Sequence, residues 1–314
     1  MQANRLAEIF APDFDLEKTL NSGQVFHWEK YQAGFAGTIA SLSILVEQSG
    51  EILKIRCGQR LGVAKNLSTI VAHYFALDHP LAKICASFPN DAAMDGARAF
   101  CCGLRLIRQP VWECLATFIC SSMKQVAHIR QISLNLRCRF GRARPLFTTH
   151  IYDFPSARRL AQETEVALRQ CGLGYRAKNL LATARLVADG DAKLEAWRCL
   201  PDEELRSHLC ALPGVGPKVA NCAMLFAYER ITAFPIDVWI ERVLRQSYFQ
   251  GKKRPTATAL ARFAGEYFGP HGGYAQQYLF HHARSTNRRG KKANLGETNR
   301  RRSLPQDDMR AGAQ

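Results

Sequence analysis

The sequence lacks a long apolar run, an export signal and any cysteine after Cys222. No stretch of about 18 apolar residues occurs, so we expect no transmembrane helix. The first ten residues, MQANRLAEIF, do not have the basic-then-apolar order of a signal peptide, and we expect the protein to stay inside the cell. Eleven cysteines are scattered along the chain. In a protein that is not exported they are typically reduced thiols, so we expect no disulfide framework.

Acidic residues are also scarce. Asp and Glu number 27 against 43 Lys and Arg, which gives a formal net charge of +16. Residues 1–100 contain 9 basic and 10 acidic side chains, whereas residues 101–314 contain 34 basic and 17 acidic ones. This distribution indicates a surface for a polyanion, and nucleic acid is favoured over a membrane because no basic amphipathic anchor is present. The alternative is that the charge only keeps the chain soluble.

The length of 314 residues favours about two domains. A period of two with glycine-containing turns predicts a β-meander over residues 21–57, and a period between three and four predicts helices from residue 66 onward. We therefore predict an α+β fold with a small antiparallel sheet followed by a larger all-helical region. The expected strands are residues 24–28, 34–40, 43–48 and 51–57.

Pattern and composition divide the chain into three parts. We expect an N-terminal sheet-and-helix domain over residues 1–96 and a helical domain over residues 97–284. Residues 285–314 hold eight basic and three acidic residues and almost no large apolar ones. We expect this segment to be a basic disordered tail that touches phosphates without reading sequence.

Residues 202–228 contain the most informative local pattern, which is a helix, a tight turn and a second helix. The turn is Pro-Gly-Val-Gly at residues 213–216, and Pro217 suits the first turn of a helix, where a missing N–H costs nothing. Glycines let the backbone approach a ligand, and the N–H groups at the start of the second helix form an anion site. We interpret the pattern as a helix-hairpin-helix that holds a DNA phosphate. An ordinary corner between two helices is the alternative.

Lys218 lies in the first turn of the second helix, and Asp237 follows nineteen residues later, before the helical run VWIERVLRQ. A lysine is a nucleophile only as the free amine, which the positive end of a helix and a dry pocket both favour. Asp237 has the position of a helix N-cap, and its carboxylate can act in proton transfer. Together the two residues suit imine chemistry at a sugar C1′. Considered alone, Lys218 could instead contact a DNA phosphate without acting as a nucleophile. Asp237 alone could be an ordinary helix N-cap.

Three further stretches resemble one family of proteins. NSGQVFHW (21–28), CGLRLIRQPVWECLATFICSS (102–122) and CGLGYRAKNL (171–180) are similar to segments of the 8-oxoguanine DNA glycosylases of the eukaryotic type, in the helix-hairpin-helix DNA glycosylase superfamily. The similarity extends from about residue 15 to residue 283. The resemblance implies a TBP-like antiparallel sheet domain packed on a larger all-helical glycosylase domain, with DNA gripped at the junction.

The resemblance also implies a reaction. The enzyme would be a bifunctional DNA N-glycosylase and abasic-site lyase that flips an 8-oxoguanine nucleotide out of the duplex, with formamidopyrimidines as further candidate lesions. Lys218 would attack C1′ and expel the base, and the resulting Schiff base would permit β-elimination of the 3′ phosphate. Asp237 would stabilise positive charge on the sugar and assist the proton transfers.

The lesion differs from guanine by an oxygen on C8 and a hydrogen on N7, so an acceptor becomes a donor. By resemblance, the carbonyl group of Gly23 accepts from this N7–H, and the unmatched acceptor of normal guanine costs about 1–3 kcal/mol. Gln276 would read the Watson–Crick edge, and Phe280 and Cys222 would cover the two faces of the base. Without the resemblance, Gly23 is a simple turn residue, and Phe280 and Cys222 are core residues. The implied pocket residues are Gly23, Cys222, Pro235, Asp237, Gln276 and Phe280.

Several positions depart from the family pattern. The family has asparagines after ICSS, one of which contacts the cytosine opposite the lesion, whereas this chain has MKQ at residues 123–125. His128 replaces an arginine that helps to read the same cytosine, and Trp239 replaces a phosphate-contacting histidine. We therefore predict a weaker preference for cytosine opposite the lesion. The residues expected to contact DNA are Met123, Lys124, Gln125, His128, Tyr175, Arg176, Gly214, Val215, Gly216 and Trp239.

The positions of the cysteines bear on cofactors. Related branches of the superfamily carry an iron–sulfur cluster on four cysteines after the catalytic aspartate, and this chain has no cysteine there. No other His/Cys grouping has metal spacing, and we interpret the adjacent pair His281-His282 as surface or DNA-facing, so no metal or other cofactor is expected. The expected partner is double-stranded DNA that contains oxidised guanine. We expect a monomer without a membrane, in the cytoplasm or nucleoid if bacterial and in the nucleus if eukaryotic.

Two other functions stay open. A monofunctional glycosylase for alkylated bases shares the fold and the aspartate but lacks the lysine, so Lys218 argues against it. A non-catalytic helix-hairpin-helix DNA-binding module explains the charge and the hairpin, but it assigns no role to Asp237, Gln276 or the SGQ turn.

Overall fold

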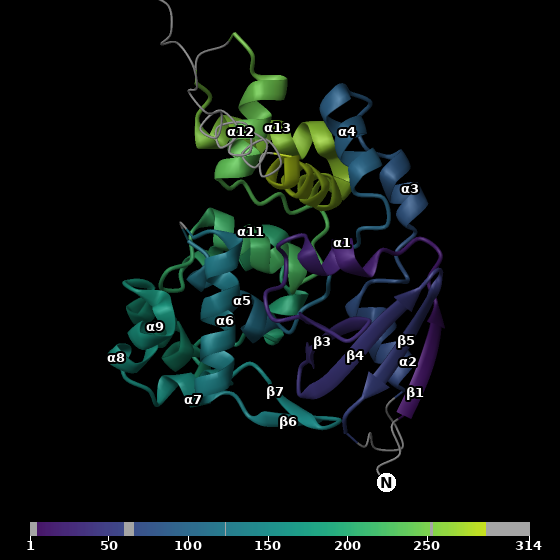
Figure 1. Cartoon of the computed structure of the whole chain (residues 1–314). Coiled ribbons are helices and arrows are strands. Elements are labelled where there is room, and N and C mark those ends of the chain that lie inside the picture. The colour runs from purple at the N-terminus through teal and green to yellow at the C-terminus, as the bar shows by residue number, and fades with distance from the viewer. Residues whose placement is uncertain (1–4, 60–65, 123, 252–253, 287–314) are drawn as a thin grey trace, which may run out of the picture.

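The computed structural model describes residues 5–59, 66–122, 124–251 and 254–286. An antiparallel sheet lies beside a larger, mostly helical part, which confirms the predicted α+β class (Figure 1). The strand order of the sheet is β1-β5-β4-β3-β2. The strands are β1 (Arg5–Phe10), β2 (Glu29–Tyr31), β3 (Gly34–Ile39), β4 (Leu42–Ser49) and β5 (Ile52–Cys57).

One face of the sheet packs on the N-terminal core, and the other face is covered in part, because Ala36 of β3 and Leu45 of β4 pack with Leu146 of the larger part. Along β5, Leu53 and Ile55 are buried whereas Lys54 between them is exposed, which is the period-two pattern of a strand with one face on a core. The helix α2 (Leu67–Tyr74) packs on this core through an apolar stripe, so the helix expected from residue 66 is confirmed.

Two parts of the predicted meander differ from the structure. Residues 24–28 form no strand, although their side chains are buried. The side-chain amide of Gln24 donates to the Arg105 carbonyl oxygen (2.8 Å) and accepts from the Ile107 N–H (2.7 Å), so this segment is bonded to the chain that leads into the helical part. In addition, the sheet gains an edge strand that the sequence did not predict, because β1 pairs with β5.

The larger part also contains a two-stranded ribbon, β6 (Ala143–Leu146) and β7 (Thr149–Tyr152), so the prediction of an all-helical domain is wrong in this detail. Four residues per strand are too few to register as a period of two.

We refer to the helical residues 272–286 as the last helix. The other elements are α1 (Leu16–Asn21), α3 (Leu81–Ala86), α4 (Ala92–Phe100), α5 (Val111–Cys120), α6 (Val126–Phe140), α7 (Ala157–Ala161), α8 (Glu165–Leu168), the π-helical η1 (Arg169–Leu173), α9 (Arg176–Asp189), the 3₁₀ turn η2 (Ala196–Cys199), α10 (Asp202–Cys210), α11 (Pro217–Phe226), α12 (Val238–Tyr248), α13 (Ala257–Phe268) and the 3₁₀ turn η3 (Gly269–His271).

The two parts interlock instead of meeting at one boundary. Phe26, from the N-terminal segment, packs in the helical core, and Ile107 packs in the core under the sheet. The predicted division between residues 96 and 97 falls inside α4, which packs in the helical core. The predicted tail begins at residue 285, but residues 285–286 still belong to the last helix, and the rest of the tail lies outside the described residues.

A buried ionic cluster joins the sheet to the helices. Glu113 of α5 pairs with Arg137 of α6 and with His27 Nδ1 at 3.3 Å. Arg137 also donates to Thr38 Oγ1 of β3 (2.8 Å). Burial, assisted by Arg137, lowers the pKa of His27 well below its ordinary value, and burial raises the pKa of Glu113. Separation of the two parts would remove His27 and Thr38 from this ion pair and leave hydrogen-bonding groups of Glu113 and Arg137 without these partners, which is unfavourable in a buried site.

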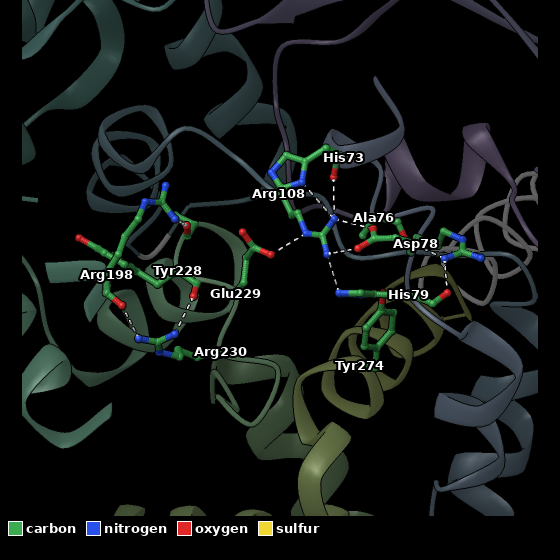
Figure 2. Close-up of polar contacts among 12 residues, drawn as sticks. His73, Ala76, Asp78, His79, Arg108, Arg198, Tyr228, Glu229, Arg230 and Tyr274 are labelled. Carbon is green, nitrogen blue, oxygen red and sulfur yellow. Dashed lines mark hydrogen bonds and ion pairs between the residues drawn. The ribbon is translucent and has the colours of Figure 1, made fainter. Parts of the chain in front are cut away.

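A second polar network fixes the last helix. Arg108 makes a bidentate ion pair with Asp78 (2.6 and 2.9 Å), pairs with Glu229 at 2.7 Å and lies 2.8 Å from His79 Nε2 (Figure 2). His79 Nδ1 in turn lies 2.8 Å from the hydroxyl oxygen of Tyr274, in the last helix. The network therefore connects the segment after α2, the loop after α11 and the last helix.

All eleven cysteines lie in the described residues and are unpaired. Burial raises the pKa of several of them, that of Cys101 and that of Cys120 to about 12, which keeps these groups as unreactive thiols. None of the helices in the described ranges is long and apolar enough to span a membrane.

Candidate active site

The predicted helix-hairpin-helix is present as α10, a turn and α11. The first helix ends at Cys210, and Pro217 occupies the first turn of α11 as expected. Gly214 has a φ of +79°, a left-handed conformation that favours glycine. A β-carbon at this position would lie 2.7 Å from Cβ of Asn179. The turn therefore needs glycine both for its conformation and for the space.

Lys218 is half-buried in the first turn of α11. Its Nζ donates a hydrogen bond to Ser121 Oγ at 2.9 Å and lies 5.1 Å from the centroid of the Phe118 ring. Ser121 is the C-cap of α5, and its hydroxyl donates to the Phe118 carbonyl oxygen at 2.7 Å. Because its proton is used in that bond, the Ser121 oxygen serves as an acceptor toward Lys218. The C-terminal end of α5 thus holds the amine in place.

Asp237 is the N-cap of α12, as predicted, and its Oδ1 accepts from the N–H groups of Trp239 (3.0 Å) and Ile240 (2.9 Å). Burial raises the pKa of Asp237 and outweighs the opposite effects of these donors and of Lys218. Cys222, one turn after Lys218, is buried, and burial raises its pKa to about 11. Lys218 acts electrostatically on both Asp237 and Cys222. We call Lys218, Cys222 and Asp237 the lysine cluster.

A second cluster forms where the turn at residues 21–23 meets the last helix. Gly23 has a φ of +89°, and a β-carbon there would lie 3.0 Å from Phe280 Cε1 and 2.8 Å from Arg284 Nη1. Phe280 is half-buried and Arg284 is buried. Residues from the two ends of the described chain are therefore in close contact around Gly23, and a larger residue at this position would push them apart.

The main-chain carbonyl groups on both sides of Gly23 accept hydrogen bonds from side chains. None of the described residues donates a hydrogen bond to the carbonyl oxygen of Gly23 itself. That oxygen is therefore open to a donor on a ligand. The neighbouring bonds run from Arg284 to Asn21 (2.5 Å), from Gln277 to Ser22 (3.1 Å) and from Gln109 to Gln24 (2.8 Å).

Gln276 lies one turn before Phe280 on the last helix and is 4% exposed. Its Oε1 is buried and has no hydrogen-bond partner within the described part of the chain. Buried polar atoms are almost always paired, so an open amide oxygen marks a place for a ligand atom. We call Gly23, Gln276 and Phe280 the turn cluster.

Phe118 connects the two clusters. Its ring lies 5.1 Å from Lys218 Nζ and 5.9 Å from the ring of Phe26, which follows Gly23 by three residues. Pro235 is buried in the loop that leads into the lysine cluster. The residues expected to form the pocket therefore belong to one region of the helical core and its junction with the N-terminal segment.

The residues expected to contact DNA have different environments. Met123 lies outside the described residues. Lys124 is half-buried, and Gln125, the N-cap of α6, and His128 are exposed. Tyr175 is 59% exposed, which leaves its ring accessible to a partner.

Arg176, in contrast, is bonded inside the protein. It is 5% exposed, and its guanidinium donates to the carbonyl oxygens of Ser122 and Leu173. The guanidinium also lies 4.3 Å from the centroid of the Tyr175 ring. In this conformation Arg176 is bonded to the main chain of Ser122, next to Ser121. Its contact with DNA stays a prediction.

At the hairpin, Val215 is buried and Gly216 is exposed, so the main chain of the turn is the part that a phosphate can reach. Trp239 is half-buried, and the guanidinium of Arg242 lies 5.2 Å from the centroid of its ring. Trp239 therefore sits beside a positive charge at the start of α12.

His281 is not the surface residue expected from the sequence. It is buried against Phe100, with 5.5 Å between the ring centroids, because it follows the buried Tyr278 by three residues and so shares its side of the last helix. Burial, assisted by Arg284, lowers the pKa of His281 to about 4, so the ring is neutral at neutral pH. In the described ranges no group of three or more His, Cys, Asp or Glu side chains is placed to hold a metal ion.

Two family models match consecutive parts of the chain. The model described as 8-oxoguanine DNA glycosylase, N-terminal domain, matches residues 8–115, and the model described as HhH-GPD superfamily base excision DNA repair protein matches residues 116–269. The N-glycosylase/DNA lyase of Saccharomyces cerevisiae is 30% identical over 260 residues, which cover 74% of this chain and 68% of that protein. The chain belongs to the 8-oxoguanine DNA glycosylase family.

Solved structures agree with this assignment. MBOgg1 in complex with a low-affinity DNA ligand is 29% identical, with a TM-score of 0.83 over 91% of this chain and 100% of that chain. The Clostridium acetobutylicum 8-oxoguanine glycosylase/lyase, in complex with double-stranded DNA containing cytosine opposite 8-oxoguanine, is 27% identical, with a TM-score of 0.82 and the same coverage. The family resemblance expected from the sequence is confirmed, and this glycosylase is a bifunctional DNA N-glycosylase/lyase.

Three residues of the site were not predicted, namely Ser121, Phe118 and Arg284. Ser121 and Phe118 lie in the stretch that carries the resemblance, but nothing in the sequence connects them to Lys218. Arg284 follows Phe280 by four residues and so lies on the same side of the helix. That spacing was the available signal for a partner of the stacking ring.

Proposed function

We propose that this glycosylase excises 8-oxoguanine from double-stranded DNA through a Schiff base between Lys218 and C1′ of the flipped nucleotide. The observation that carries the proposal is the lysine cluster, in which a half-buried amine is fixed by Ser121 near the half-buried carboxyl group of Asp237. A lysine that only contacts a phosphate needs neither the serine nor a neighbouring carboxyl group.

The proposed reaction begins with the nucleotide outside the base stack. The Nζ lone pair of Lys218 attacks C1′ while the bond from C1′ to the base breaks, and the base leaves with the electron pair of that bond. Asp237 stabilises the positive charge on the sugar and takes part in moving the proton from Nζ. Opening of the sugar ring gives the Schiff base, and loss of a C2′ proton then expels the 3′ phosphate. The raised pKa of Asp237 suits a group that exchanges protons.

The turn cluster supports recognition of the lesion. The Gly23 carbonyl oxygen is the acceptor that we assign to N7–H, because its neighbours in the turn are already bonded. Gln276 is assigned to the Watson–Crick edge, and Phe280 and Cys222 to the two faces of the base. Normal guanine presents an acceptor at N7 and leaves Gly23 unmatched, at a cost of about 1–3 kcal/mol. Formamidopyrimidines, which carry an N–H at the corresponding position, are the second proposed substrate.

We also propose a weaker preference for cytosine opposite the lesion than the family pattern implies. Arg176 is committed to main-chain carbonyl groups, and His128 stands where the family has an arginine. Single-turnover excision rates opposite C, A, G and T measure this preference. A preference for cytosine above about a hundredfold would contradict the proposal.

The proposed partner is double-stranded DNA inside the cell, on which the protein acts as a monomer without a membrane, metal or other cofactor. The net charge of +16 supports binding to a polyanion. No cysteine follows Cys222, so the chain after Asp237 offers no thiolates for an iron–sulfur cluster.

Reduction with sodium borohydride tests the covalent step, because it converts a Schiff base into a stable amine. On an 8-oxoguanine:C duplex we expect a covalent complex with the unmodified protein and none with Lys218→Gln. Lys178→Gln, at an exposed position of α9, is the matched control and should retain the complex. Base release without a covalent complex would support a monofunctional alkylated-base glycosylase, and binding alone would support a non-catalytic module.

A further inference from the structure

We infer that Arg284 is a positioning residue that sets the width of the slot for the lesion base, by holding the turn at Gly23 against the ring of Phe280. The inference rests on the proposed function, because it concerns the base that the slot accepts. It adds to that function a residue on which selectivity for the oxidised base depends.

The geometry that points to Arg284 is a set of contacts that joins the last helix to the turn at residues 21–23. Arg284 Nη2 donates to the Asn21 carbonyl oxygen at 2.5 Å, and its guanidinium carbon lies 5.4 Å from the centroid of the Phe280 ring. Its Nη1 lies only 2.8 Å from the position that a β-carbon of Gly23 would take. One planar group thus touches the turn, the glycine and the stacking ring.

A second side chain of the last helix also bonds to the turn at residues 21–23. Gln277, Phe280 and Arg284 follow one another at spacings of three and four residues, so they share one face of the helix. Gln277 donates to the Ser22 carbonyl oxygen at 3.1 Å. Because two successive carbonyl groups are bonded, the position of the next one, at Gly23, is fixed relative to Phe280.

An arginine suits this place better than other residues. Arg284 is 7% exposed, and a buried charge is costly unless it is well bonded. The planar guanidinium can donate in its plane to a carbonyl group while its face or edge lies against an aromatic ring, which the point charge of a lysine does not match. A hydrogen bond weakens steeply as its angle departs from linearity, so a small movement of the Gly23 carbonyl group changes how well it distinguishes a donor from an acceptor.

The experiment compares Arg284→Met with the unmodified protein on three duplexes, containing 8-oxoguanine, guanine or an abasic site. We expect excision of 8-oxoguanine to fall by about tenfold or more, and its rate relative to guanine to fall as well. Cleavage of the abasic duplex should stay within about twofold, because that substrate has no base to occupy the slot. Arg262→Met, at an exposed position of α13, is the control and should leave all three rates unchanged.

Each other outcome has a clear meaning. An equal loss on the 8-oxoguanine and abasic duplexes would show that Arg284 is only structural, and unchanged selectivity would also overturn the inference. If Arg284→Met unfolds at the assay temperature, Arg284→Gln, which keeps an amide donor, is measured on the same duplexes with the same criteria. If the unmodified protein excises no 8-oxoguanine but cleaves the abasic duplex, the proposed substrate fails, which is distinguishable from a failure at Arg284.

Discussion

Ser121 is the residue through which α5 holds the Lys218 amine, at 2.9 Å. In Ser121→Ala the amine loses this acceptor and occupies a wider range of positions, so we expect single-turnover excision to slow by about tenfold. Binding to an uncleavable duplex should be unchanged, because the substitution removes only the hydroxyl group and keeps the hydrogen bond from the Lys124 N–H to the Ser121 carbonyl oxygen (3.2 Å). Ser122→Ala, at the adjacent position, is the control. Rates within about twofold of each other for the two variants would contradict the assigned role of Ser121.

Asp237 is assigned a catalytic role, and its charged form lowers the free energy of unfolding. Its raised pKa means that the folded state favours the protonated carboxyl group, so stability falls as the pH rises from 3.8 through the raised value. In Asp237→Asn the amide oxygen still accepts from the helix N-terminus without carrying a charge. We expect this variant to unfold at a higher temperature than the unmodified protein at pH 7, and the difference to disappear toward pH 3.8.

The same variant should lose excision activity by about a hundredfold or more, because an amide cannot move the proton or stabilise the sugar cation. Thermal unfolding and single-turnover rates measured on one preparation test both effects. Asp189→Asn, at the exposed end of α9, serves as the control for a loss of one negative charge. An Asp237→Asn protein that is both less stable and fully active would refute the assignment.

At the scale of residues, sequence predicted the groups with a local signal and missed those without one. Lys218 and Asp237 were predictable because each stands at a recognisable helix start. Long-range contacts were not predictable. Ser121, which bonds Lys218, is 97 residues away from it, and Arg284, which bonds Asn21, is 263 residues away. Such contacts exist only once the helices have packed.

At the scale of elements, the hairpin between α10 and α11 depends on the conformation of one residue. In Gly214→Ala the left-handed φ of +79° is retained only with strain, and the new methyl group would meet Asn179 at 2.7 Å. We expect the free energy of unfolding to fall by about 2 kcal/mol or more. Urea unfolding at neutral pH measures this change.

Gly216→Ala provides a control from the same turn. Gly216 has a negative φ of −99°, and nothing lies within 4 Å of a β-carbon there, so the loss should be at most about 1 kcal/mol. Equal losses for the two variants would show that the strain and the contact at Gly214 are unimportant.

The strand predictions failed where the apolar pattern of the sequence does not match the contacts in the structure. In β1 the apolar side chains of Leu6 and Phe10 are exposed, at 58% and 66%, so hydrophobicity does not mark the buried face of this strand. Residues 24–28 have the composition of a strand, but the Gln24 side chain bonds them to a distant segment. Composition and period therefore predicted α2 and the central strands, where the apolar pattern and the burial agree.

At the scale of the whole molecule, two buried histidines should weaken the fold in mild acid, against the opposite effect of the raised pKa of Asp237. Burial lowers the pKa of His281 to about 4 from an ordinary value of 6.5, and that of His27 is lowered as well. As the pH falls below 6.5, the unfolded chain binds protons that the folded protein does not bind until about pH 4, so the free energy of unfolding decreases through this window. At about 1.4 kcal/mol per pH unit, the share of His281 is about 3 kcal/mol at most.

Urea unfolding between pH 7 and about pH 4 measures this loss. We expect His281→Asn to reduce the dependence on pH, even though the variant is less stable at pH 7, because its side chain has no proton to bind. His150→Asn, at an exposed position of β7, should leave the dependence unchanged. An identical slope in the unmodified protein and in His281→Asn would contradict the prediction.

The contact between Gly23 and Arg284 has a consequence for how the protein is made. During synthesis the ribosome releases Gly23 and Lys218 before the last helix, so a partly made chain carries both residues without the helix that completes their surroundings. On the proposed function, such a chain would hold Lys218 without the residues that position a base beside it. The site for the base is therefore complete only after the last helix has folded against the turn at Gly23.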